Sequence, residues 1–272
     1  MNKELFDLDN PRMVLMGLLA KNGVTADEYS KFLEKFKDCD FEKVFSGEDE
    51  DDDEEIDYLP MDDDNEKTLR LKIQLRDVNK PPMWREVLVP ADFNFSQLHY
   101  VIQAVTGLKN NHLWQFERKP YDRLGLAIGI PKRSFDSFGI EDCSHIADNF
   151  PLTAFLSQKG DKLVYVYDFK NDWIFNVSVL EVMERQGEVA ECIKYKSDLQ
   201  AIEDMPGFIY PNLRNCLNDP KSVPDDWAQR IAGILWLDDK NKLQQFLERH
   251  TIDLEEVNDE LSDIPEKWED ID

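Results

Sequence analysis

Apolar and polar residues alternate strictly along residues 69–76, which read Leu-Arg-Leu-Lys-Ile-Gln-Leu-Arg. The side chains of a β-strand point alternately to its two faces, so this pattern predicts a strand with one apolar and one basic face. Pro81-Pro82 ends this strand, because proline cannot donate a backbone hydrogen bond to a neighbouring strand. A second strand is predicted over residues 84–89, which read Trp-Arg-Glu-Val-Leu-Val.

A β-hairpin is predicted over residues 162–181, where alternating aromatic and aliphatic residues flank a short polar turn. Asp168 and Asp172 flank the turn, and Trp173 closes it. Aromatic side chains at alternating strand positions usually belong to the core or form cross-strand pairs. We therefore expect most of them to be buried, and we expect Trp173 to be partly exposed at the turn.

Helical spacing of apolar residues marks other parts of the chain. Ser96 is expected to cap a helix that ends at Gly107, and residues 1–46 and the residues from Pro224 onward also have helical patterns. The remaining predicted elements are strands at 112–117 and 188–195 and a short helix at 151–157. Together these elements predict an α+β fold, in which a mostly antiparallel sheet with a packed helix lies between a helical N-terminal hairpin and a helical C-terminal region.

The net charge of −25 is concentrated in two segments. Residues 48–66 hold 13 Asp or Glu and no Lys or Arg, and residues 253–272 hold ten acids and one base. Residues 67–252 are nearly balanced, with 24 bases against 25 acids. Runs of like charge are usually solvated, so residues 48–66 are interpreted as a disordered acidic linker. Because this segment directly precedes the basic strand, the alternative is that it folds back onto the basic face and blocks anionic partners.

These changes of composition divide the chain into four parts. The predicted parts are an N-terminal helical hairpin at 1–47, the acidic linker at 48–66, an α+β core at 67–220 and a helical C-terminal region with an acidic tail at 221–272. The four cysteines are too far apart in sequence for a zinc knuckle or a redox pair, which indicates free thiols in a reducing compartment. No stretch has the pattern of a secretory signal or the length of a membrane span, so we expect a cytoplasmic protein without membrane contact.

Three segments carry a family pattern when they are taken together and in order. They are Pro81–Arg85 with the strand after it, Leu98–Gln103 with His112–Phe116, and Tyr165–Phe169 with Asp172-Trp173. In this order and spacing the chain resembles the plasmid pRiA4b ORF-3-like family over roughly residues 68–260. The resemblance implies a compact α+β domain and suggests a link to mobile genetic elements. Some members are labelled transposon resolvases or passenger proteins, but the nucleophilic serine within an arginine cluster that a serine recombinase needs is not recognisable here.

The sequence departs from the family pattern at the hairpin turn. The family's turn reads Asp-Phe-Gly-Asp, with a histidine two residues after the tryptophan. Here Lys170 takes the glycine position, Asn171 is an added residue and Phe175 replaces the histidine. The family's later Pro-Pro-Glu-Asp segment has its nearest counterpart at Met205–Pro211, in which we find no acidic pair. An activity that depends on that histidine or those carboxylates is therefore not expected.

Asp168, Asp172, His99 and His112 are the candidate catalytic residues, because carboxylate and imidazole groups suit Mn, Fe or Zn and also acid–base chemistry. The alternative is structural, since aspartates of a turn commonly bond its local amides. No dinucleotide fingerprint, phosphate loop or Ser-His-Asp order is recognisable. We accordingly predict no cofactor and assign no metal site.

Arg70, Lys72, Arg76 and Arg85 are the candidate anion-binding residues. The first three share the basic face of the predicted strand, and Arg85 is close to it in sequence. The alternative is the solvated outer face of an antiparallel sheet, which is the commoner case. Because the core has no net positive charge and no helix-turn-helix or zinc motif, nucleic acid is not the expected partner of this chain alone.

The sequence favours a non-catalytic interaction module that binds another protein. The alternative function is a degenerate or uncharacterised metal-dependent enzyme that uses the set Asp168, Asp172, His99 and His112. Clustering of these four side chains in a concave pocket would favour the enzyme. Scattered or buried positions would favour the interaction module.

Overall fold

The computed structural model describes residues 66–121, 125–129, 145–203, 205–239 and 241–264, all of which belong to one compact unit, Tyr58–Asp272. The predicted helical hairpin at 1–47 lies outside the described residues. The same holds for residues 48–65 of the predicted acidic linker and for the end of the acidic tail.

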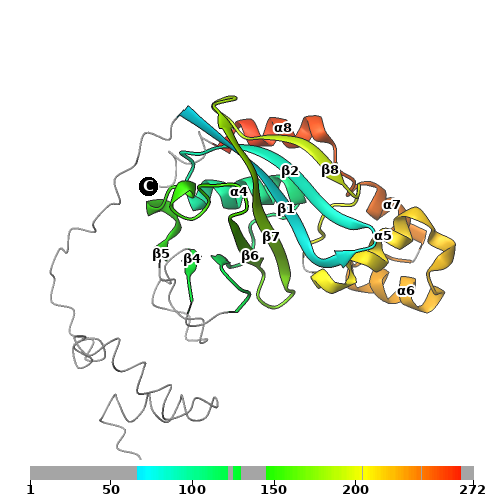
Figure 1. The fold of residues 1–272 in the computed structure, drawn as a ribbon. Helices are drawn as coiled ribbons and strands as arrows, with labels where there is room; N and C mark the ends of the chain where they lie inside the picture. Colours follow the sequence, from blue (N-terminus) through cyan, green and yellow to red (C-terminus); the bar gives the residue numbers. More distant parts are fainter. Residues whose placement is uncertain (1–65, 122–124, 130–144, 204, 240, 265–272) are drawn as a thin grey trace, which may run out of the picture. The chain divides into compact units, whose positions relative to one another are not determined.

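The described strands form one sheet in the order β5-β4-β3-β6-β7-β1-β2-β8 (Figure 1). Neighbouring strands are antiparallel except for the short parallel pair of β4 and β5. The strands are β1 (Lys67–Asn79), β2 (Pro82–Pro90), β3 (Trp114–Glu117), β4 (Ala127–Gly129), β5 (His145–Ile146), β6 (Lys162–Tyr167), β7 (Trp173–Glu184) and β8 (Glu191–Lys196). The predicted α+β fold with a mostly antiparallel sheet is confirmed.

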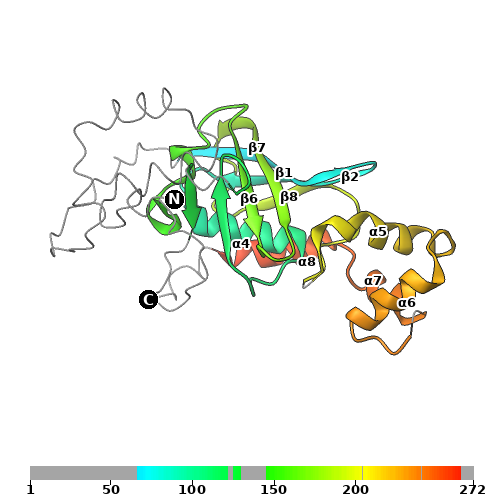
Figure 2. The ribbon, with the colours of Figure 1, turned by 90° about the horizontal axis from the view of Figure 1, so that it is seen from below.

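Two helices, α4 (Phe95–Thr106) and α8 (Leu254–Ser262), lie together on one face of the sheet (Figure 2). Asn94 caps α4, because its side chain accepts from the Gln97 amide while the Gln97 side chain accepts from the Asn94 amide. The prediction of Ser96 as the cap was wrong, since its hydroxyl instead donates to Asp148. Gly107 ends α4 with a φ of 81°, as the sequence predicts.

Three further helices, α5 (Tyr210–Asn218), α6 (Asp225–Ile234) and α7 (Asn241–Glu248), lie beyond one end of the sheet, at the right of Figure 1. Helices from Pro224 onward were predicted, whereas α5 was not. Leu213, Leu247 and Val257 of the C-terminal helices join the same hydrophobic cluster as the sheet. No helix among the described residues is long and apolar enough to span a membrane.

β1 separates an apolar face from a polar face. Leu71 is fully buried, whereas Arg70 and Lys72 on the opposite face are only half-buried. The register carries this division across the sheet, because Leu71 lies opposite Val87 of β2 and Val179 of β7. The predicted alternation is confirmed. Within the described part of the chain no helix covers the polar face, which we call the outer face (Figure 2).

β6 and β7 form the predicted hairpin, with Asp168 and Asp172 in its turn at φ values of 52° and 55°. Aspartate adopts this left-handed conformation more readily than most residues. The prediction that Trp173 is partly exposed was wrong, because the side chain is only 1% exposed. Its ring packs against Phe175 and Tyr210, with centroid distances of 6.2 and 6.4 Å. Tyr210 begins α5, the helix that the sequence pattern did not predict.

Candidate functional site

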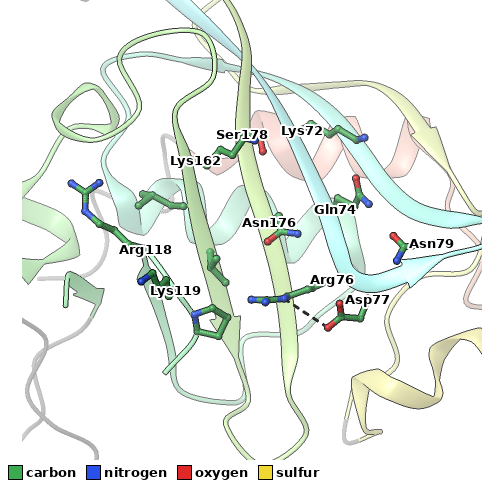
Figure 3. A pocket seen from close by; sticks show the side chains of 13 residues that line it. Lys72, Gln74, Arg76, Asp77, Asn79, Arg118, Lys119, Lys162, Asn176 and Ser178 are labelled. Carbon is green, nitrogen blue, oxygen red and sulfur yellow. Dashed lines mark ion pairs between the residues drawn. The ribbon is translucent and has the colours of Figure 1, made fainter. Parts of the chain in front are cut away.

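A groove with a volume of about 820 Å³ opens on the outer face of the sheet (Figure 3). Its walls come from β1, β6 and β7 and from the segment that follows β3. The charged side chains that line it are Lys72, Arg76, Arg118, Lys119, Lys162 and Asp77. Five cationic groups therefore face one carboxylate around a single concavity, which we call the basic groove.

Strand register explains why these side chains meet. Ser178 of β7 lies opposite both Lys162 of β6 and Lys72 of β1, and residues directly opposite in a sheet share a face. Arg118 and Lys119 follow directly after β3, the strand that pairs with β6. Figure 3 shows these two side chains on one side of the basic groove and the side chains of β1 on the other.

Carboxylates of the described residues neutralise little of the positive charge of the basic groove. The Nε atom of Arg76 lies 3.7 Å from the Asp77 carboxylate, but both side chains are exposed, and such surface pairs stabilise a protein little. Within the described ranges, Lys72, Arg118, Lys119 and Lys162 have no carboxylate within ion-pair distance. Among the described residues, therefore, no carboxylate has to be displaced from these four cations by an incoming anion.

The other two candidate anion-binding arginines lie elsewhere. Arg70 shares the outer face, but its guanidinium lies 2.7 Å from Glu86 and 3.4 Å from Glu181. Hydrogen bonding and charge attraction by Glu86 raise the pKa of Arg70. Arg85 lies on the apolar face and is fully buried. Of the four sequence candidates, Lys72 and Arg76 line the basic groove.

A second group of functional side chains lies at the hairpin turn. The His112 Nε2 atom is 3.4 Å from Asp168 Oδ2 and 3.5 Å from Glu203 Oε1. The same Glu203 oxygen accepts a 2.5 Å hydrogen bond from the hydroxyl of Tyr167. Asp168 and Glu203 are mostly buried, whereas the His112 side chain is 29% exposed. This arrangement holds an accessible imidazole between two carboxylates.

Asp168 also organises the turn, as the structural alternative predicts. Its carboxylate accepts from the backbone amide of Lys170 at 3.2 Å and from the side-chain amide of Asn171 at 2.6 Å. Its own backbone amide donates to the Leu113 carbonyl at 3.0 Å, which ties the turn to β3. The Asp168 side chain therefore both stabilises the turn and contacts His112.

His99 and Asp172 have other side-chain partners. His99 is 1% exposed, and its ring stacks on Trp114 at a centroid distance of 4.1 Å. Burial lowers the pKa of His99 to about 3, so the ring is neutral at pH 7. Asp172 accepts a hydrogen bond from the Tyr121 hydroxyl. The structure thus brings together His112 and Asp168 but not the full predicted set, and the described residues hold no group of three or more metal-ligating side chains suited to an ion.

Sequence reasoning missed Glu203, although a signal for it was present. The segment compared with the family's acidic motif was taken to begin at Met205, but the acidic pair Glu203-Asp204 directly precedes it. Glu203 reaches the hairpin turn, and Asp204 lies outside the described residues. Met205–Pro211 itself has no acidic pair, but an acidic pair begins two positions before it.

Comparison with known proteins finds a curated relative, a solved structure and a family similar to this chain. An uncharacterised protein of Sinorhizobium fredii, y4hQ, is 30% identical over 154 residues, which cover 56% of this chain and 74% of that protein. A crystal structure of a protein of unknown function from Methanosarcina mazei Go1 is 26% identical, with a TM-score of 0.46 over 57% of this chain and 83% of that one. The model of the plasmid pRiA4b ORF-3-like family matches residues 67–244, and the chain belongs to this family.

Proposed function

We propose that this protein is a non-catalytic interaction module that binds an anionic partner in the basic groove. The observation that carries the proposal is the excess of five cationic side chains over one carboxylate around one concavity. A concave surface lined by one sign of charge concentrates ligands of the opposite sign, even when the whole protein is not basic. A link to mobile genetic elements is part of this proposal and rests on the family name alone.

Reversing the charge of one wall should weaken the binding of polyanions by about tenfold or more, because association with a polyanion scales with the number of cationic contacts. The test variant is Arg118→Glu with Lys119→Glu, since both side chains are exposed. The measurement is the salt concentration at which the full-length protein elutes from immobilised heparin. We expect the wild type to be retained at low salt and the variant to elute earlier.

The matched control is Lys221→Glu with Arg249→Glu, which changes the net charge equally at two exposed positions outside the basic groove. This control should elute close to the wild type. If both variants shift equally, net charge alone governs retention and the basic groove is not the binding surface. A wild type that flows through at low salt would also overturn the proposal.

A second candidate function is acid–base catalysis at the hairpin turn, which is favoured by the position of His112 between Asp168 and Glu203. If this site is catalytic, His112→Ala and Glu203→Gln should each abolish hydrolysis of p-nitrophenyl phosphate or acetate, assayed with and without Mn²⁺. His250→Ala, on a histidine that hydrogen-bonds within the C-terminal helices, should leave that rate unchanged. A wild-type rate equal to that of buffer would contradict this second candidate.

A further inference from the structure

We infer that the anionic partner is a single-stranded nucleic acid, an inference that rests on the proposed function of the basic groove. The feature that points to this class is Trp84 of β2, which is partly exposed on the outer face. The ammonium groups of Lys72 and Lys194 lie 5.4 and 5.8 Å from the centroid of its ring. Lys72 also lines the basic groove, so this one lysine adjoins both the groove and the Trp84 ring.

Further cationic side chains lie on the outer face beyond Trp84, on the neighbouring strand β8. Register places Trp84 opposite Gln74 on one side and Lys196 on the other, and Lys194 and Lys196 of β8 are both exposed. From Arg118 after β3 to these lysines the path crosses five strand spacings, about 24 Å. A path of this length suits an extended chain of phosphates better than one small anion.

Uncharged hydrogen-bonding side chains lie between the cations. Gln74 of β1 lies opposite Asn176 of β7, and both line the basic groove together with Ser178 (Figure 3). Amide and hydroxyl groups of this kind can bond the edges of unpaired bases. A sheet surface that alternates cations, amides and an aromatic ring therefore matches the needs of both phosphates and bases.

The Trp84 ring distinguishes this partner from other polyanions. Unpaired bases stack on an aromatic side chain, whereas the bases of a duplex remain stacked on each other. A carboxylate of an acidic protein segment gains nothing from the ring, because the face of an aromatic ring is negative. An acidic segment of a protein partner would therefore bind without using Trp84.

Fluorescence anisotropy of the full-length protein tests the inference with three labelled probes: a 20-nucleotide oligouridine, a duplex of the same length and polyglutamate. The oligouridine should bind most tightly. Trp84→Leu should weaken its binding by roughly 5- to 100-fold, as loss of one stacked base predicts, and Trp84→Phe should restore most of it. Trp236→Leu, at a tryptophan that is 93% exposed outside this face, is the matched control and should have no effect.

Lys194→Gln with Lys196→Gln provides a variant that does not touch the apolar side of the sheet, and it should weaken oligouridine binding and flatten its salt dependence. Equal binding of all three probes, or oligouridine binding that survives Trp84→Leu, would overturn the inference and leave the proposed function standing. Preferential binding of the duplex or of polyglutamate would overturn it as well. Loss of all polyanion binding, including retention on heparin, would overturn the proposed function itself.

Discussion

Replacing Arg85 with leucine is expected to lower the free energy of unfolding by about 3–5 kcal/mol, because several buried carbonyls would lose their donor at once. Arg85 is fully buried. Its Nε atom donates to the Val105 carbonyl at 2.9 Å, and its Nη1 atom lies 3.1 Å from the carbonyls of Trp84, Lys196 and Ser197. These acceptors belong to the last turn of α4, to β2 and to the end of β8.

The position of these acceptors explains why one guanidinium contributes so much. Carbonyls in the last turn of a helix have no partner within the helix, and the end of β8 needs donors as well. Burial lowers the pKa of Arg85, and no carboxylate among the described residues pairs with it. The guanidinium is instead stabilised by carbonyl oxygens and by the Tyr195 ring, whose centroid is 5.6 Å away. The side chain therefore joins three elements at one point.

Urea denaturation, followed by tryptophan fluorescence, measures this effect. Arg85→Lys should recover only part of the lost stability, because an ammonium group cannot match the planar, forked geometry of a guanidinium. Arg249→Leu, at an exposed arginine of the C-terminal region, is the control and should change stability by less than about 0.5 kcal/mol. A loss below about 1 kcal/mol for Arg85→Leu would show that water or rearranged side chains replace the guanidinium.

The placement of Arg85 could have been predicted from the sequence. Met83, Val87 and Val89 are apolar residues at alternate positions of β2, and Arg85 occupies the remaining position of the same series. Side chains two residues apart in a strand point to the same face, so this spacing assigns Arg85 to the buried face. Its closeness in sequence to the basic strand suggested exposure instead. The strict alternation of β1 gave the correct answer for Lys72 and Arg76 because every second residue there is apolar.

Much of the candidate site depends on strand order, which a single sequence does not contain. Lys162 and Lys72 share the basic groove because β6 and β1 both pair with β7. The β6–β7 pairing is the predicted hairpin, whereas the β1–β7 pairing joins distant parts of the chain. Glu203 and His112 are also far apart in sequence, and only the folded chain brings their side chains to within 3.5 Å. β4 and β5 have three and two residues, which is too short for any periodicity to be recognised.

His99 is expected to make the protein sensitive to acid between about pH 6.5 and pH 3. The ordinary histidine pKa of 6.5 applies to the unfolded chain, whereas burial lowers the pKa of His99 in the folded protein to about 3. Between these values the unfolded state binds a proton that the folded state does not. The contribution of the neutral His99 ring to the free energy of unfolding is therefore fully present above pH 6.5. Below that pH it falls by about 1.4 kcal/mol per pH unit, so that about 2 kcal/mol is lost at pH 5.

The hydrogen bonds of His99 explain why the folded protein resists protonation. Gln103 donates to the Tyr165 hydroxyl at 2.8 Å, so this hydroxyl is free to donate its own proton to His99 Nδ1, which is 2.7 Å away. His99 Nε2 then donates to Asn110 Oδ1 at 2.9 Å. If Nδ1 carried a proton, it could no longer accept the hydrogen bond from the Tyr165 hydroxyl. That hydroxyl would then lose its acceptor inside a fully buried site.

The free energy of unfolding should be measured from pH 7.5 to pH 4.5 for the wild type and for His99→Gln, which keeps an amide donor and acceptor but does not titrate. The variant is expected to be less stable at pH 7.5, and the difference from the wild type should shrink by about 2 kcal/mol by pH 5. Carboxylates contribute equally to both curves, so only the difference between the curves reports the histidine. Parallel curves for His99→Gln and the wild type would mean that His99 takes up its proton at the same pH in the folded protein as in the unfolded chain, so that burial does not lower its pKa.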